Sequence, residues 1–534
     1  MAAEVGWVLL VVLGICAAAL LARRTGVPSP VLLVLGGLAV ALVPGVPHLE
    51  LEPEVILVLI LPPLLYSSAL ESSLVDFRAN TRPIVLLSVG LVVFTCLAVA
   101  AVVHLLVPGV PWAAALALGA ILGPPDAVAA IAIGRRIGLP ARLMTLIEGE
   151  GLLNDATALV LYQVAVAAVV AGSFSPAQTG LRLVLAPVGG LAVGLAVAWL
   201  VSRVRRRLDE PLVENVLSLA TPFLAYLPAE RLHVSGVVAV VICGLVLGHQ
   251  TETLLSSASR LQTTPVWKFT VFLLEGLIFL LIGLQLPRIL QVVDSYRPAQ
   301  LLGWSAAVVL VVLLTRPLWI WPATYLPRRL SRRLRERDPD PPWQSTAALS
   351  WAGMRGVVSL AAAFAIPLTT ADGDPFPERD LLLFLAFVAI LTTLLLQGLT
   401  FARVLRALDL RPDRQGLLLA QASAQQAATR AGLSRLDELA GPSPLEQETA
   451  DQLRSAAARR ANAQWERLAE LRPDETGNDT PSAVWRRLRL AMLEAERREL
   501  TRLRDEGDLP DEALREMRSR LDLEEATLTI SRDS

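Results

Sequence analysis

Long apolar stretches constrain this chain most, because about 20 consecutive apolar residues are enough to cross the hydrocarbon core of a bilayer. The hydrophobic content of 54% and the mean hydropathy of +0.54 also exceed those of ordinary soluble domains. We therefore predict an all-α polytopic membrane protein with 13 transmembrane helices. The expected spans are roughly residues 5–22, 29–45, 54–70, 83–107, 111–134, 143–171, 181–202, 211–228, 234–249, 266–287, 300–325, 344–368 and 380–401.

The basic residues between these spans predict how the chain is oriented, since cytoplasmic loops retain Lys and Arg. Loops after odd-numbered spans hold 19 Lys or Arg residues, whereas loops after even-numbered spans hold 5. This bias predicts a multi-pass protein of the cell membrane with its N-terminus outside and its C-terminus in the cytoplasm. An error of one span would scramble the alternation, so the bias also supports the count of thirteen.

The composition changes after residue 401, where 22 of the 48 basic and 25 of the 49 acidic residues lie. We predict a transmembrane domain over residues 1–401 and a cytoplasmic tail over 402–534. Leucines at helical spacing in the tail indicate packed amphipathic helices, one of them starting at Thr480 and Pro481 as cap and first turn. The tail is expected to be regulatory or dimer-stabilising, with a purely structural appendage as the alternative.

Two of the predicted spans should be interrupted near their midpoints. Gly123-Pro124-Pro125 in the fifth span removes two backbone donors, and Asp126 follows directly. In the twelfth span Gly353 and Gly356 flank Arg355. These spans are seven apart and so cross in opposite directions, which is the pattern of inverted repeats with two unwound helices meeting at the midplane.

The sixth span carries a carboxylate near its centre, where an ionised acid is costly. Asp155 occupies this position, next to Asn154. On a helix Glu150 and Asn154 share a face, whereas Asp155 is turned about 100° away and can point into a cavity beside Asp126. We therefore expect Asp126 and Asp155 to belong to one site.

The remaining intramembrane charges need partners. We expect Arg355 to pair with Glu150 as a buried structural ion pair, which would leave Asp155 able to change its charge. Glu148 is expected at a water-accessible mouth. Glu275 could either line the ion path or pair with Arg316, and the sequence does not separate these two interpretations.

Taken together, these motifs resemble the monovalent cation/proton antiporters, in particular sodium/proton antiporters of the NhaP and NHE type. The resemblance covers about residues 5–405 and implies an NhaA-like fold, a homodimer, and a core that moves like an elevator against a scaffold. The matching stretches are PPDAVAA (124–130), EGEGLLNDATALV (148–160), FLLIGLQLP (279–287), TRPLW (315–319) and GMRGVVSLA (353–361).

The same resemblance implies roles for individual residues. The aspartate matching Asp155 binds either the cation or the proton, and the one matching Asp126 helps to form the site, so Na⁺ is expected at these two residues. The pair Asn154 and Asp155 implies electroneutral exchange. The pair matching Glu150 and Arg355 is structural.

Two positions depart from the family pattern. Many close relatives have Ser where Gly151 stands, and others have Glu where Ser67 stands. Both differences subtract an oxygen ligand, and a hard cation prefers several oxygens. Ser67, water or the Pro125 carbonyl would have to complete the shell, which leaves the choice among Na⁺, Li⁺ and K⁺ open.

The expected function is secondary active exchange of a monovalent cation for H⁺, with the two competing for Asp155 and with activity falling at acid pH. We expect no enzyme activity, cofactor or nucleic-acid partner; GxxxxGK[ST], the phosphate loop of many ATPases, is absent from the sequence. Membrane lipid is the expected surrounding. A cation channel and an intramembrane aspartyl protease are the alternatives, and cation-dependent proton movement would separate them from an antiporter.

Overall fold

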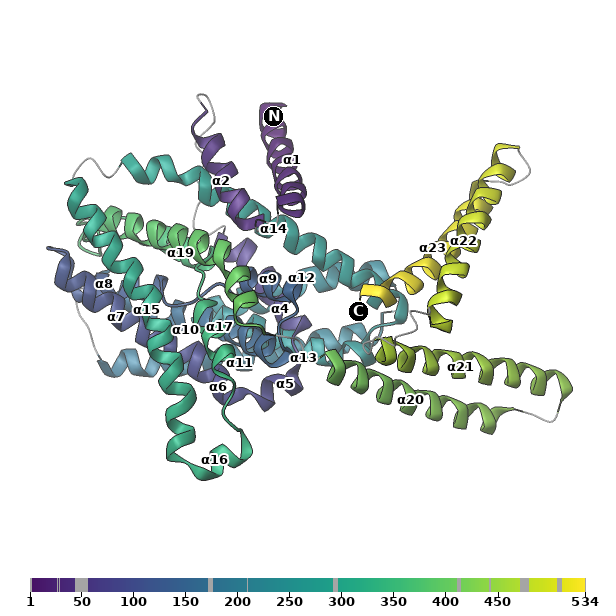
Figure 1. Cartoon of the computed structure of the whole chain (residues 1–534). Helices are drawn as coiled ribbons and strands as arrows, with labels where there is room; N and C mark the ends of the chain where they lie inside the picture. The colour runs from purple at the N-terminus through teal and green to yellow at the C-terminus, as the bar shows by residue number, and fades with distance from the viewer. Residues whose placement is uncertain are drawn as a thin grey trace. The chain divides into compact units, whose positions relative to one another are not determined.

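The computed structural model describes residues 2–25, 27, 29–43, 56–170, 176–208, 210–291, 296–410, 414–440, 443–470, 480–506 and 511–533. Over these ranges the chain is helical and has no β-strand, only one isolated bridge between Thr369 and Pro375. It divides into two compact units, Met1–Pro412 and Asp413–Ser534. Figure 1 follows the chain through the first unit to the paired helices of the second.

Most helices of the first unit fall within the apolar stretches of the sequence, and several of those stretches hold more than one helix, whereas the short helices α5 and α16 lie between them. The bounds are α1 Ala2–Thr25, α2 Ser29–Ala41, η1 Ile56–Ile60, α4 Leu61–Glu71, α5 Leu74–Ala79, α6 Thr81–Val85, η2 Leu86–Leu91, α7 Val92–Leu106, α8 Trp112–Ile121, α9 Ala127–Ile137, α10 Ala141–Val170, α11 Pro176–Arg205, α12 Pro211–Arg231, α13 Gly236–Leu254, α14 Ser257–Gln291, α15 Pro298–Leu330, α16 Arg332–Arg337, α17 Trp343–Trp351, α18 Val357–Phe364 and α19 Arg379–Ala407.

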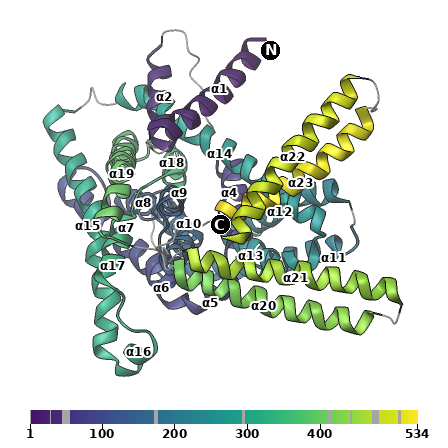
Figure 2. The ribbon, with the colours of Figure 1, turned by 45° about the vertical axis from the view of Figure 1, so that its right-hand side comes forward.

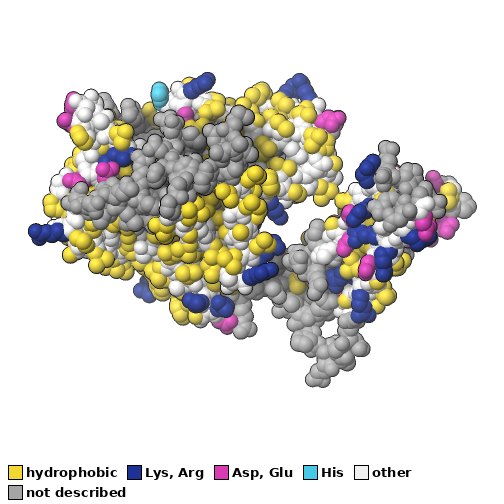
Figure 3. Space-filling view, turned by 90° about the horizontal axis from the view of Figure 1, so that it is seen from above, with side chains coloured by type: hydrophobic (Ala, Val, Ile, Leu, Met, Phe, Trp, Pro, Cys, Tyr) yellow, Lys and Arg dark blue, Asp and Glu magenta, His cyan; other side chains and the backbone are white. Residues whose placement is uncertain are grey.

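Seven helical stretches among the described residues are long and apolar enough to cross a membrane, and four shorter helices are apolar as well. Figure 3 shows hydrophobic side chains over much of the described surface of the first unit, with charged ones mainly near its edges. Such a surface suits lipid contact. The crossing count of thirteen and the inverted repeats remain predictions.

Both predicted helix interruptions are confirmed. Residues 122–126 separate α8 from α9, and residues 352–356 separate α17 from α18. The two interrupted segments touch, because the Asp126 backbone N–H donates to the Met354 carbonyl at 2.6 Å. Backbone groups without helical partners can persist in an apolar environment only when they are satisfied in this way.

The long helix α10 lies at the centre of the unit and packs against α8, α9, η2 and α13. Figure 2 shows α8, α9 and α10 grouped together in its interior. Although α10 is apolar in most positions, it buries Glu150, Asn154 and Asp155. The helix that holds the core together therefore also carries the buried polar residues.

The predicted ion pair between Glu150 and Arg355 is wrong, because Arg316 of α15 binds Glu150 instead. The Arg316 guanidinium donates to both carboxylate oxygens at 2.5 and 2.8 Å, and its Nε donates to the Leu349 carbonyl at 2.8 Å. Both side chains are almost fully buried, with exposures of 2% and 3%. The fork of an arginine matches the two oxygens of a carboxylate, so this geometry is the favourable one.

Arg355 instead binds the backbone of the other helix break. Its Nη1 donates to the Gly123 carbonyl at 2.5 Å, and its backbone N–H donates to the Thr393 hydroxyl at 3.3 Å. The helix break leaves the Gly123 carbonyl without a helical donor. Arg355 supplies that donor, so it ties the two breaks together.

The second unit consists of two helical hairpins, α20 Arg414–Leu439 with α21 Pro444–Glu470, and α22 Pro481–Asp505 with α23 Asp511–Asp533. Two apolar stripes were expected within it, one of Leu493, Leu500 and Leu503 and one of Leu514, Met517 and Leu521; Leu493, Leu500 and Leu514 are buried, whereas Leu503 and Leu521 are partly buried and Met517 is exposed. Thr480 caps α22 as predicted, since its hydroxyl accepts the Ala483 N–H at 3.3 Å.

Removing one partner of the Glu150–Arg316 pair should strongly destabilise the first unit. Glu150→Gln leaves the Arg316 charge buried without compensation, and we expect a loss of about 3–5 kcal/mol. Thermal unfolding of the detergent-solubilised protein, followed by size-exclusion chromatography, measures this effect. Glu336→Gln is the matched control, because its exposed pair with Arg332 should contribute little. Equal melting temperatures for the two variants would contradict the assignment.

Candidate functional site

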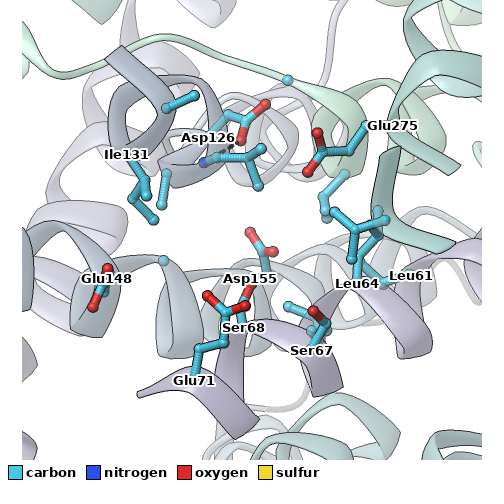
Figure 4. Close-up of a pocket in the computed structure, with 18 of the residues that line it drawn as sticks. Leu61, Leu64, Ser67, Ser68, Glu71, Asp126, Ile131, Glu148, Asp155 and Glu275 are labelled. Carbon is cyan, nitrogen blue, oxygen red and sulfur yellow. Dashed lines mark hydrogen bonds between the residues drawn. The ribbon is translucent and has the colours of Figure 1, made fainter. Parts of the chain in front are cut away.

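A cavity of about 350 Å³ opens beside the interrupted helix between α8 and α9. Its lining comes from α4, the break at residues 122–126, α9, α10, α14 and the start of α18. Asp126, Asp155, Glu275, Ser67 and Pro125 are among the residues that line it. Figure 4 shows the Asp155 carboxylate directed into the space between Asp126 and Glu275 on one side and Ser67 on the other.

The two aspartates predicted to share a site line the same cavity. Asp155 lies in the middle of α10 with an exposure of 8% and makes no hydrogen bond or ion pair with the described residues. Asp126 is the N-cap of α9, where its Oδ1 accepts the Val128 N–H at 2.9 Å. Asp126 is therefore fixed in orientation, whereas Asp155 keeps both oxygens available.

Gly356 sets how closely the second interrupted segment approaches Asp126. A Cβ built on Gly356 would overlap the Asp126 carboxylate. Only glycine allows the two breaks to pack at this distance. The glycine that the sequence marked as a helix interrupter thus also makes room for the carboxylate.

Asn154 does not line the cavity, in contrast to its expected place at the ion. Its Nδ2 donates to the Pro125 carbonyl at 2.8 Å, and its buried Oδ1 has no hydrogen-bond partner among the described residues. Asn154 thereby holds a carbonyl that the Gly-Pro-Pro break leaves without a helical donor. Its observed contact orients the break next to Asp126.

Gly151 lines the cavity one turn before Asp155, but there is no room for a side chain at this position. A Cβ on Gly151 would overlap the methyl group of Ala127 at the start of α9. Here α10 and α9 pack too closely for serine. Ser67, Ser68 and Ser359 line the same cavity and provide hydroxyl oxygens instead.

Glu275 of α14 belongs to the cavity, which decides between the two interpretations of its sequence position. Its proposed partner Arg316 is occupied by Glu150, whereas Glu275 lies with Asp126 and Asp155 in the lining. A third carboxyl group therefore faces the cavity. Sequence position alone could not show this, because both helices pass through the same depth of the fold.

The mouth of the cavity is formed by a charged cluster. Arg135 of α9 contacts Glu71 and Glu148, each at 3.2 Å, and Glu148 is partly exposed as predicted. Lys268 of α14 also lies on the lining. Neither Arg135 nor Lys268 was expected at the site from the sequence, and their place in loops on the predicted cytoplasmic side was the available signal.

The lining holds five acidic and two basic side chains, so the cavity should attract cations. Carboxylate, hydroxyl and carbonyl oxygens are the ligands that hard cations prefer. Among the described residues there is no group of three or more His, Cys, Asp or Glu arranged to hold a metal ion.

Comparison with known proteins places the chain in a family. The family described as "Sodium/hydrogen exchanger, transmembrane" matches residues 8–407. An uncharacterised Na⁺/H⁺ exchanger of Mycobacterium tuberculosis is 38% identical over 96% of this chain and 94% of its own length. A sodium, potassium, lithium and rubidium/H⁺ antiporter of Bacillus subtilis is 35% identical over 69% of this chain and 56% of its own length.

The fold is also similar to that of a solved transporter. The sodium proton antiporter MjNhaP1 of Methanocaldococcus jannaschii aligns with a TM-score of 0.61 and 20% sequence identity, covering 76% of this chain and 98% of the other. These matches agree with the all-helical architecture. The chain belongs to the sodium/hydrogen exchanger family, a family of multi-pass membrane transporters.

Proposed function

We propose that the protein exchanges a monovalent cation for H⁺ and that the two compete for Asp155. The observation that carries this proposal is a buried carboxylate that has no partner among the described residues, in a cavity whose acidic mouth lies on the predicted cytoplasmic side. Asp126 is fixed beside it by the N-cap hydrogen bond. Glu275 and Ser67 line the same cavity and supply further oxygens to the ion.

The energetics of a buried charge give the mechanism. An ionised carboxylate in an apolar environment is costly unless a proton or a cation compensates it. Asp155 loaded with either partner is cheaper to move across the membrane than empty Asp155. The empty site therefore stays on its side, and loading in turn by cation and proton produces coupled exchange.

The neutral Asn154 next to Asp155 supports electroneutral exchange, because only one of the two adjacent residues can carry charge. In our proposal the core around α8–α10 and α17–α19 moves as an elevator against the remaining helices, and two copies form a homodimer in the cell membrane. The N-terminus lies outside and the second unit in the cytoplasm, where it regulates transport or stabilises the dimer. Thirteen crossings with inverted repeats complete this scheme.

Sodium is the proposed main cation, and potassium and lithium are alternatives. The matched Bacillus subtilis antiporter is named for sodium, potassium, lithium and rubidium, and a matched Synechocystis antiporter for low-affinity Na⁺/H⁺ exchange. This chain lacks the serine and the glutamate that relatives carry at residues 151 and 67, and its cavity offers other hydroxyl groups instead. Such a ligand set agrees with weak binding that accepts several monovalent cations.

Replacing Asp155 by asparagine should abolish exchange while the protein still folds. The amide cannot hold a proton or balance a cation, so Na⁺ added to acid-loaded vesicles should no longer alkalinise the lumen. A pH-sensitive dye in reconstituted vesicles measures the flux, and unfolding temperature verifies folding. Persistent Na⁺-evoked alkalinisation in folded Asp155→Asn would remove Asp155 from the mechanism.

Acid pH should lower the apparent affinity for sodium and leave the maximal exchange rate unchanged. When one proton competes for one site, the apparent KM for Na⁺ approaches an increase of about tenfold per pH unit once the protonated form predominates. Initial rates at several sodium concentrations and pH values separate the two parameters. A fall in maximal rate at constant KM would instead indicate a separate regulatory proton site.

The close contact between α10 and α9 predicts how a serine at residue 151 would behave. Gly151→Ser should lose most activity or stability, because its Cβ overlaps Ala127. Adding Ala127→Gly removes the obstructing methyl and should restore folding and flux. Ala127→Gly alone is the control. Full activity of Gly151→Ser without the second change would show that the helices separate easily.

A further inference from the structure

A second recess lies away from the ion cavity, on the surface shared by α6, η2 and α15. It is a groove of about 760 Å³ whose lining is almost entirely apolar and shares no residue with the ion cavity. Val85, Leu318 and Leu326 expose 42%, 61% and 54% of their surface there. The full lining is Thr81, Arg82, Val85, Leu86, Leu318, Trp319, Pro322, Ala323, Leu326 and Pro327.

The floor of this groove is rigid. Trp319 donates its Nε1 hydrogen to the Leu86 carbonyl at 2.9 Å and packs on Phe94 with ring centroids 5.4 Å apart. The Trp319 ring also fills the space beside Gly90. The groove is therefore formed by fixed contacts between η2 and α15.

One arginine stands at the end of the groove that the arginine bias predicts to be cytoplasmic. Arg82 is exposed and has no hydrogen bond or ion pair with the described residues. It also lines a neighbouring cavity of about 630 Å³. An unpaired guanidinium at the membrane surface, above an apolar groove, is complementary to an anionic group on an acyl chain.

The other charges of the neighbouring cavity are largely balanced. Asp338 bridges Arg142 at 2.6 Å and Arg328 at 2.5 Å. Partial burial would raise the pKa of Asp338, but the hydrogen bond and charge of Arg142, then those of Arg328, hold this pKa below its ordinary value. The two arginines are thus engaged with a carboxylate, which leaves Arg82 to meet an anion; Asp340 and Asp409 are exposed at the rim.

The prolines of α15 add acceptors to the same groove. Pro322 and Pro327 cannot donate the helical hydrogen bonds that the carbonyls of Leu318 and Ala323 would normally receive. Leu318 and Ala323 both line the groove. Hydroxyl groups of a polar headgroup could satisfy such carbonyls, whereas a plain hydrocarbon chain could not.

We propose that this groove is a specific site for a phospholipid with an anionic, hydroxyl-bearing headgroup, whose phosphate pairs with Arg82 and whose acyl chain lies along Val85, Leu318 and Leu326. The bound lipid bridges η2 and α15, the helix that carries Arg316. The site does not depend on the proposed exchange reaction, because none of its lining residues contributes to the ion cavity.

Native mass spectrometry of the full chain tests this proposal. The detergent-solubilised protein is supplied with phosphatidylglycerol or with phosphatidylcholine of the same chains, and retained lipid is counted. We expect phosphatidylglycerol to be retained about fivefold more tightly, the preference that one arginine near the membrane surface supplies. Arg82→Gln should abolish the preference, and Val85→Trp should lower retention of both lipids by filling the groove.

Arg329→Gln is the matched control. Arg329 lies in the last turn of α15 and is exposed like Arg82, but it lines neither recess. It should keep the preference. Equal retention of the two lipids by the unaltered protein, or an unchanged preference in Arg82→Gln, would reduce the groove to ordinary lipid contact and overturn the proposal. If chain-free glycerophosphoglycerol displaced the bound phosphatidylglycerol, Arg82 would be a site for a soluble phosphate ester. If Val85→Trp changed the oligomeric mass, the groove would be a contact with a second copy of the chain. Either result would reject the lipid proposal.

Discussion

Backbone groups inside an apolar protein must be hydrogen-bonded, and the rest of this structure depends on how two interrupted helices meet that requirement. The Asp126 N–H donates to the Met354 carbonyl, Arg355 donates to the Gly123 carbonyl, and Asn154 donates to the Pro125 carbonyl. Each break thus supplies what the other lacks. The crossing creates a polar centre in which carboxylates can be placed without unfolding the unit.

The buried charges around this crossing fall into two kinds. Glu150 and Arg316 neutralise each other through two hydrogen bonds and can contribute only to structure. Asp155, five residues further along α10, has no hydrogen-bond or ion-pair partner among the described residues and faces the cavity. A buried charge that the protein leaves uncompensated is one that a mobile proton or cation can compensate, which is the physical basis of the proposed exchange.

Several parts of this arrangement could be predicted from the sequence because they depend on local chemistry. Consecutive glycine and proline residues, or paired glycines, next to a charged residue in mid-span favour a helix break, so the breaks at residues 123–125 and 353–356 were expected and are present. An acid in an apolar helix must face a cavity or a partner, which placed Asp126 and Asp155 together. The Thr480 cap of the tail helix followed from the same kind of local rule.

What the sequence by itself determined is therefore the set of apolar helices, the points where they break and the acids that need compensation. Only the tertiary structure decided which arginine meets Glu150, whether Glu275 faces the cavity and whether residue 151 has room for a side chain. Two arginines of equal charge were available in the sequence. The choice between them depends on the direction of each guanidinium and on free carbonyls nearby, and these are set by helix packing between segments far apart in the chain.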